Sequence, residues 1–366
     1  MLNWSLYQDS FSTSTMRDVW SESRTIETWL QVEKTLADCQ SKLDLIPVEA
    51  ASQLQQISID QLDQPMLIEE MNLVGRPIVG LVKQLRTLVG NENGQYIHYK
   101  TTTQDIMDTA MVLQMKLGLA NIVESIDRSI ALLVDHANKH KDTSAMGRTN
   151  GQYAIAIKFS TKFLVWIAEL QRRITALKQA AKRGIIVQIG GPVGDLCLYE
   201  NDAGTLVKAN VAEALGLGTV EPHWQNARDG IADIITALGA LCATLCKIAH
   251  NINLLSSSDI GELSEDYKTG KGVSSSMAHK KNQRATEYGE AVARLGRQRS
   301  EQINEVTLHE HERSGGVWIA EWVIVPEVFL LTSGALMWNE QTLDGLKVHK
   351  KIMESNIGRY KHQKIR

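Results

Sequence analysis

The chain has 366 residues, of which 43% are hydrophobic, and a formal net charge of −3. This length exceeds one ordinary hydrophobic core and predicts two or three packing units. A nearly neutral chain lacks the electrostatic footprint of a protein that binds nucleic acid or an anionic membrane, so neither is expected as a partner.

The predicted elements are long amphipathic helices. Apolar residues repeat at steps of three and four, a period typical of helices that bury one face. One short strand is expected at 184–189, where apolar residues meet a Gly-Gly-Pro turn. The fold class is therefore all-α, a long-helix bundle with at most a minor β-hairpin near 184–194. The expected helical segments, in chain order, are 24–43, 106–119, a segment from near Ile155 to Leu177, 229–255 and 323–336.

Further patterns in the sequence predict the domain boundaries and the cellular location. We expect boundaries near Val89 and Leu346, which give an N-terminal helical domain (1–89) and a central bundle domain (90–346). No run of about 18 apolar residues is uninterrupted, so no membrane span is expected. The first ten residues lack a basic start and an apolar run, which predicts a cytoplasmic protein. The four cysteines are not spaced as metal ligands, so no metal site is expected.

A polar segment from 256 to 286 interrupts the helical pattern. It holds hydroxyls at Ser274, Ser275 and Ser276, ahead of Lys280 and Asn282. Loops of this length are uncommon in compact domains and are usually lids, binding loops or linkers. Hydroxyls beside cations suit an anionic substrate, because Lys pairs with carboxylate oxygens and lowers the pKa of a nearby hydroxyl. On composition alone, a solvated Ser/Lys linker explains the segment equally well.

The order of residues in this segment resembles a family signature. Residues 274–282 read Ser-Ser-Ser-Met-Ala-His-Lys-Lys-Asn, and Glu287 follows five residues later. The signature loop of the fumarase/aspartase superfamily is similar and reads Gly-Ser-Ser-x-Met-Pro-x-Lys-x-Asn-Pro. Val273, Ala278 and Gln283 stand where that loop has its glycine and its two prolines.

Further segments resemble the same family in the expected order. Residues 98–105, 147–152, 188–194 and 228–229 look like its His-Tyr-Gly-x-Thr-Ser-Gln-Asp, Gly-Arg-Thr-His-Gly-Gln, Gln-x-Gly-Gly-x-x-Gly and Arg-Asp segments. Residues 74–82 and 311–327 are similar to its 3-carboxy-cis,cis-muconate cycloisomerase branch. The resemblance spans roughly residues 11 to 357. It implies the long-helix bundle of this family, and residues 347–366 then correspond to the truncated start of a C-terminal domain.

The resemblance also implies a chemistry. Family members abstract a proton next to a carboxylate of a succinate- or muconate-like polycarboxylate, and the resulting aci-carboxylate dianion needs cations and hydrogen-bond donors around it. The implied base is Ser274. The implied substrate-binding residues are Thr102, Thr103, Asn150, Gln152, Arg228, Ser275, Lys280 and Asn282.

The general acid is the least determined part of the predicted site. Many family lyases place a His at position 150, paired with a Glu at position 287, but Asn150 cannot exchange a proton near neutral pH. The cycloisomerase branch also lacks that His. His98 is the best remaining candidate, and His279 and His309 are weaker ones. Glu287, without its His, could act in catalysis or only brace Lys280.

Two classes of function stay open. The first is an enzyme that lactonises 3-carboxy-cis,cis-muconate reversibly, or that releases fumarate from a substituted succinate of the adenylosuccinate or nitrosuccinate type. The second is a non-catalytic structural relative, in which Thr102, Thr103 and Asp105 only cap a helix and Arg228 is a surface charge. The retained polar residues favour the enzyme. The resemblance further implies a homo-oligomer, a tetramer whose sites draw on three chains, and no cofactor.

Overall fold

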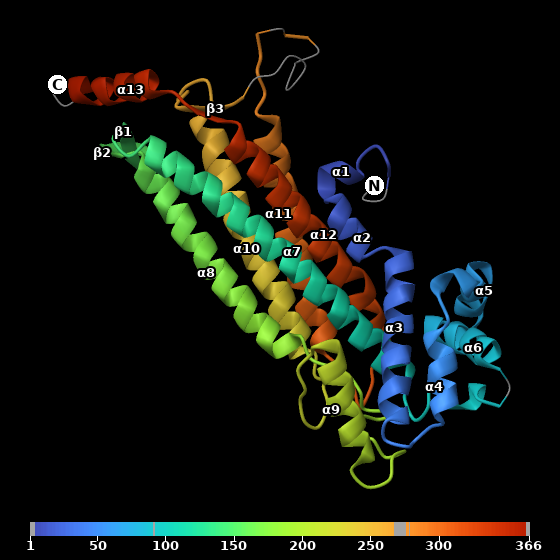
Figure 1. Ribbon diagram of the computed structural model, residues 1–366. Helices are drawn as coiled ribbons and strands as arrows, with labels where there is room; N and C mark the ends of the chain where they lie inside the picture. Colours follow the sequence, from blue (N-terminus) through green and yellow to red (C-terminus); the bar gives the residue numbers. More distant parts are fainter. Residues whose placement is uncertain (1–3, 91, 267–275, 278, 364–366) are drawn as a thin grey trace.

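The computed structural model describes residues 4–90, 92–266, 276–277 and 279–363, with side chains as far as residue 359. Long helices lie side by side and form an elongated bundle (Figure 1). This architecture confirms the predicted all-α class. The bundle helices are α7 (Thr103–Lys139), α8 (Ser160–Gly184), α10 (Asp229–Leu255), α11 (Arg284–Glu301) and α12 (Gly315–Asp344).

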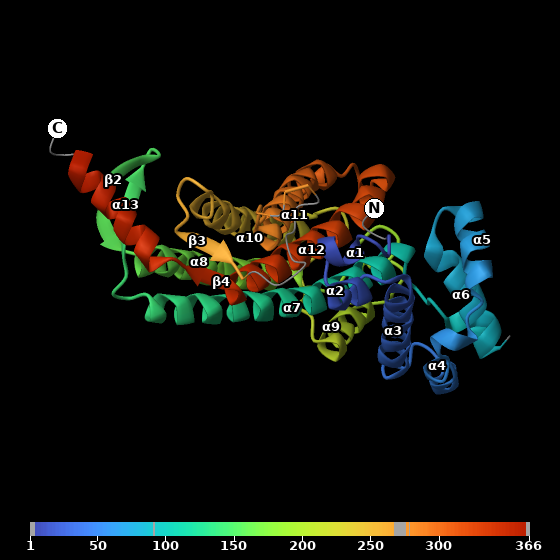
Figure 2. The same cartoon turned by 90° about the horizontal axis from the view of Figure 1, so that it is seen from above.

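Shorter helices gather around one end of the bundle, and Figure 2 shows α3 to α6 beyond the tips of the long helices. They share a second apolar core with the first turns of α7 and with α9. The short helices at this end are α3 (Glu22–Ser41), α4 (Val48–Gln55), η1 (Ile59–Gln61), α5 (Gln64–Val74), α6 (Pro77–Val89), η2 (Gly94–Tyr96), α9 (Ala203–Leu215) and η3 (Gln302–Thr307). The remaining short helices, α1 (Gln8–Phe11) and α2 (Ser14–Val19), lie instead along α12 and α7 (Figure 1).

The opposite end of the bundle carries the strands and the last helix (Figures 1 and 2). β1 (Ser144–Thr149) and β2 (Gln152–Lys158) form an antiparallel hairpin, which packs against α13 (Lys350–Gln363). Asn150 and Gly151 form its turn with φ of +50° and +75°. Such a turn matches the twist of the flanking strands. A second antiparallel pair joins β3 (Leu263–Glu265) to β4 (Leu346–Val348).

Glycines allow two long helices to approach closely. A Cβ on Gly184, at the end of α8, would lie 2.4 Å from the carbonyl oxygen of Gly230 at the start of α10. No side chain fits such a contact, so the two backbones meet there. Beyond this point the apolar stripes of α7, α8, α10 and α12 enclose one continuous core.

Two sequence expectations are wrong. Ile155 does not begin a helix, because it lies in β2 and α8 starts only at Ser160. The strand predicted at 184–189 is also absent from this described segment, apart from one isolated bridge at Ile186. The reason is that the backbone of Gln188 bonds a side chain: Thr109 Oγ1 donates to its carbonyl at 2.8 Å and accepts from its N–H at 3.1 Å.

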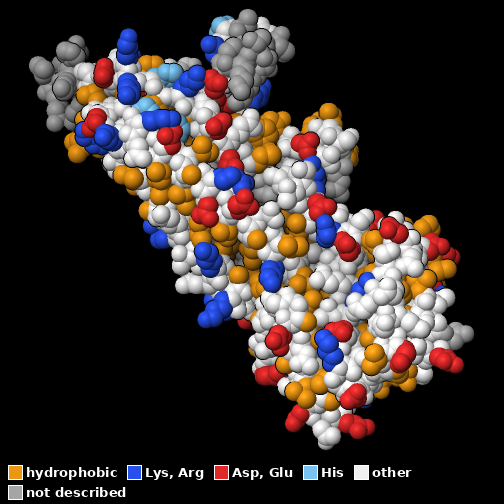
Figure 3. All heavy atoms as spheres, viewed as in Figure 1, with side chains coloured by type: hydrophobic (Ala, Val, Ile, Leu, Met, Phe, Trp, Pro, Cys, Tyr) orange, Lys and Arg blue, Asp and Glu red, His pale blue; other side chains and the backbone are white. Residues whose placement is uncertain are grey.

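Apolar side chains are exposed along the bundle, and Figure 3 shows them on the face over α7 and α8. Leu164 and Val165 on α8 are 54% and 53% exposed, and Leu117 on α7 is 50% exposed. By length and composition α10 and α12 could each cross a membrane, but 61% of each apolar window is buried inside the fold. Such burial is typical of core helices.

Candidate active site

The loop of residues 97–102 before α7 holds His98 beside a buried carboxylate. His98 Nδ1 lies 2.6 Å from Oε1 of Glu33, which projects from α3 and is 1% exposed. An ionised carboxylate only accepts, so Nδ1 donates to Glu33, and Nε2 is left for a substrate. His98 has a φ of +60° and Lys100 a φ of +53°. Non-glycine residues in this region carry strain, which is concentrated at functional sites.

Asp105 fixes this loop to a second loop. Its buried carboxylate accepts hydrogen bonds from Thr101 Oγ1 at 2.8 Å and from the N–H of Thr102 at 3.0 Å. It also accepts from the N–H groups of Gly190 and Gly191, both at 2.9 Å. Burial raises the pKa of Asp105, and these hydrogen bonds oppose the rise. The capping role considered for Thr102 and Asp105 is confirmed, because they form a capping box at the start of α7.

Arg313 approaches the same helix start from the segment before α12. Its Nη2 donates to Thr102 Oγ1 and to the carbonyl of Pro192, both at 3.1 Å, and its Nε donates to Gln104 Oε1 at 2.7 Å. Burial lowers the pKa of Arg313. Among the described residues no carboxylate forms an ion pair with Arg313, so its charge is available to an anion beside Thr102.

Arg228 differs from both of its predicted roles. It is not a surface charge, since it is 2% exposed and stacks 4.6 Å from the ring of Trp224. Its guanidinium donates to Asp108 at 2.6 and 3.1 Å and to Glu321 at 2.9 and 2.5 Å. Four of its five N–H groups are thus occupied by protein carboxylates. We correct its assignment as a substrate ligand to a structural ion-pair residue.

The other predicted residues lie toward the opposite end of the bundle. Asn150 and Gln152 are exposed at the turn of the β1–β2 hairpin, and Lys280 is exposed after the end of β3. Asn282 is half-buried at the base of the polar segment. Glu287, on the first turn of α11, pairs with Arg284 at 2.7 Å rather than bracing Lys280. Ser274 and Ser275 lie outside the described residues.

The length of α7 separates the two groups. Its 37 residues span about 55 Å at 1.5 Å per residue. His98, Thr102 and Thr103 lie at or just before its N-terminus, and the hairpin with Asn150 and Gln152 follows its C-terminus. A small substrate cannot contact both groups in one chain.

The weaker candidates for the general acid are less well placed. The side chain of His309 is 1% exposed, and its Nδ1 accepts the N–H of Ser314 at 3.4 Å. Burial, followed by the charge of Arg228, lowers the pKa of His309. His279 is exposed in a turn.

Sequence reasoning did not identify Glu33 or Arg313 as site residues. Glu33 lies on the same face of α3 as Leu30, Leu36 and Ala37, so a carboxylate on an apolar stripe was the available signal. Arg313 belongs to the segment 311–327. That segment resembles the cycloisomerase branch of the family, but the resemblance gave Arg313 no role in the site.

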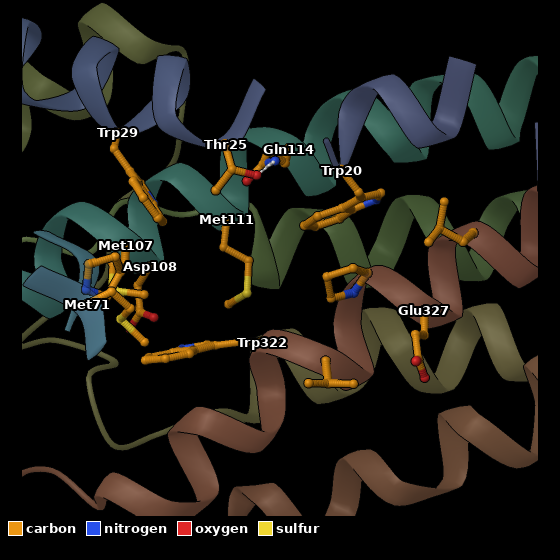
Figure 4. A pocket seen from close by; sticks show the side chains of 14 residues that line it. Trp20, Thr25, Trp29, Met71, Met107, Asp108, Met111, Gln114, Trp322 and Glu327 are labelled. Carbon is orange, nitrogen blue, oxygen red and sulfur yellow. Dashed lines mark hydrogen bonds between the residues drawn. The ribbon is translucent and has the colours of Figure 1, made fainter. Parts of the chain in front are cut away.

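A cavity of about 550 Å³ lies beside this region, between α2, α3, α7 and α12 (Figure 4). Aromatic rings and thioethers dominate its wall, with Asp108, Gln114 and Glu327 among the polar residues. None of the predicted site residues lines it. The rings and thioethers are Trp20, Trp29, Trp322, Met71, Met107 and Met111.

Comparison with known proteins gives the family. The family model described as Lyase matches residues 8–294. The chain is 31% identical to 3-carboxy-cis,cis-muconate cycloisomerase of Acinetobacter baylyi, over 96% of this chain and 79% of the relative. It is 32% identical to adenylosuccinate lyase of Methanocaldococcus jannaschii, over 95% and 76%.

A solved structure agrees with these relatives. The 3-carboxy-cis,cis-muconate lactonizing enzyme of Pseudomonas putida superposes with a TM-score of 0.90 at 30% identity, over 97% of this chain and 80% of that one. The family match, the relatives and the long-helix bundle agree with one another. The chain belongs to the lyase family of the fumarase/aspartase superfamily.

Proposed function

We propose that this protein is a cycloisomerase-like lyase that interconverts 3-carboxy-cis,cis-muconate, or a similar polycarboxylate, with its lactone. The observation that carries the proposal is the group at the start of α7. There, His98 bonds the buried carboxylate of Glu33. In the same loop, the hydroxyl of Thr102 accepts a hydrogen bond from the half-buried Arg313. A proton carrier beside a guanidinium that forms no ion pair with a described carboxylate suits a reaction that adds or removes a proton next to carboxylates.

The proposed roles divide between the two ends of the bundle. Ser274 takes the proton, while Lys280 and Asn282 bind the adjacent carboxylate and stabilise the aci-carboxylate. Thr102 and Arg313 bind a second carboxylate, with Arg313 in the place first given to Arg228. His98 protonates or orients the leaving group.

Thr103, Asn150 and Gln152 donate further hydrogen bonds to the substrate, and Ser275 lies beside the base. No cofactor is needed for this chemistry, because the electrons of the broken C–H bond stay within the substrate.

Assembly is part of the proposal, because one chain separates its site segments along α7. We propose a cytoplasmic homotetramer in which antiparallel chains bring the N-terminus of one α7 beside the hairpin and polar segment of others. The exposed apolar residues of α8 support it, since large exposed apolar patches mark interfaces.

The test is turnover of 3-carboxy-cis,cis-muconate by the purified protein, followed by loss of the conjugated diene absorbance and by lactone in the product. The His98→Asn variant should be at least about tenfold slower. The control is Asn138→Asp, a change at the exposed end of α7 outside both groups. Absence of turnover by the wild type over a panel of muconates and substituted succinates would refute the proposal.

A second candidate is a lyase that releases fumarate from a substituted succinate. The adenylosuccinate lyase relative and the His98–Glu33 pair, which could protonate a leaving nitrogen or oxygen, favour it. The same panel separates the two functions, because fumarate in the product indicates elimination and a lactone indicates cyclisation.

A further inference from the structure

The β1–β2 hairpin has little packing of its own. It consists of two strands and pairs with no third strand in the described chain. Its buried residues are confined to 145–147 on β1, while β2 is exposed or half-exposed throughout. An isolated two-stranded hairpin is marginally stable in water. Its position must therefore be set by contacts with the rest of the chain.

One buried carboxylate supplies such a contact. Glu262 is 0% exposed and accepts from Arg148 Nη2 at 2.7 Å and from Nη1 at 3.1 Å. This two-pronged arrangement of guanidinium and carboxylate fixes orientation as well as distance. Arg148 Nη1 also donates to the carbonyl of Met146 at 3.2 Å, and its guanidinium lies 5.4 Å from the ring of Tyr153. The guanidinium thus links both strands to Glu262.

Glu262 is itself fixed on three sides. Its N–H donates to the carbonyl of Leu255 at the end of α10, and its carbonyl accepts from His349 before α13, both at 2.9 Å. Asn356 of α13, 2% exposed, donates to the same carboxylate at 2.9 Å. A residue so constrained can hold the hairpin at one angle to the bundle.

The anchor lies close to candidate site residues on both sides. Arg148 precedes Asn150 by two residues, or about 7 Å of strand. Glu262 immediately precedes β3, which leads into the polar segment with Lys280 and Asn282. We infer that Glu262, through Arg148 and Asn356, is a positioning residue that sets where Asn150 and Gln152 stand for the substrate. This inference rests on the proposed function.

The experiment uses full-length Glu262→Gln, which keeps the shape and removes the charge. The control is Glu340→Gln, which weakens the ion pair between Arg128 of α7 and Glu340 of α12 (2.9 Å), a pair that belongs to neither site group. Hydrogen exchange of residues 144–158 should become roughly tenfold faster in Glu262→Gln only. With the substrate found in the turnover assay, KM should rise about tenfold and kcat should fall, well below the unfolding temperature.

Three further variants distinguish positioning from misfolding and from a purely structural role. Asn356→Ala removes one donor and should give the same changes at smaller size, and Arg148→Lys keeps the charge without the fork and should restore part of the loss seen in Arg148→Ala. Unchanged exchange, or a lower Tm with wild-type KM and kcat, would overturn the inference. If the wild type turns over none of the panel, the proposed function has failed instead, and the exchange data still decide whether Glu262 anchors the hairpin.

Discussion

At the scale of single residues, the site depends on carboxylates that never reach solvent. Glu33 fixes His98, Asp105 ties two loops to the start of α7, and Glu262 fixes Arg148. Burying such groups costs free energy unless every lone pair finds a donor. Their hydrogen bonds offset that cost. Glu33 and Asp105 hold candidate site residues in place, and Glu262 holds Arg148, two residues before Asn150.

Glu33→Gln tests the first of these carboxylates. The amide cannot accept from His98 as a charged group, so the ring loses its fixed tautomer and orientation. We expect kcat to fall by about tenfold or more. Glu27→Gln, an exposed change on the same helix, should leave kcat unchanged. Equal rates for the two variants would show that Glu33 does not support His98 in the reaction.

His309 gives a prediction on pH. Its pKa is lowered in the folded protein, chiefly by burial. As the pH falls through the usual histidine range, the unfolded chain therefore binds more protons than the folded chain. The free energy of unfolding decreases as the pH falls. Between about pH 7.5 and 5.5, the wild type should lose more unfolding free energy in urea than His309→Gln. Parallel losses would contradict this account.

At the scale of elements, the amino-acid sequence predicted the long helices well and the short elements poorly. An apolar stripe that repeats over many turns predicts a helix that packs against its neighbours. The Gln188 segment has no such periodicity, and its extended backbone bonds the Thr109 side chain rather than a strand. Ile155 and Ile157 belong to a hairpin whose signal was the Asn150-Gly151 pair. Glu33 and Arg313 join the site only through tertiary contacts, which one sequence does not reveal.

The hairpin turn yields a prediction with its own control. Gly151 has a φ of +75°, so Gly151→Ala should cost roughly 1 kcal/mol by forcing Cβ into the left-handed region. Gly316 in α12 has open space around it, so Gly316→Ala should stabilise by roughly 0.5 kcal/mol. Denaturant unfolding measures both. A loss at Gly316 as large as at Gly151 would refute the conformational argument.

At the scale of the whole molecule, the separation of site segments predicts complementation. His98→Asn and Lys280→Ala each remove a group from a different end of the bundle, so each should lose most of the wild-type activity when refolded alone. Refolded together, they should regain part of the wild-type activity, because some sites then combine two intact segments. The control is each variant refolded alone. No recovery from the mixture, with full recovery of refolded wild type, would place the whole site in one chain.

Assembly is tested by size. Light scattering of the wild type should give the mass of a tetramer. Replacing Leu164 and Val165, both more than half exposed on α8, by Ser should give a smaller species. Val48→Ser removes a similar exposed side chain from α4 and should leave the mass unchanged. A wild-type monomer at micromolar concentration would contradict the proposed site.

The unbroken run of α7 also limits how this protein can change. A single residue inserted between Thr103 and Lys139 would turn everything beyond it by about 100° and move it by about 1.5 Å. The hairpin would then face another direction relative to the start of α7, even with each of its own hydrogen bonds intact. The loops of this chain can vary in length between relatives. The length of α7, by contrast, sets the distance and orientation between the two groups of site residues, so natural insertions and deletions in α7 should be rare.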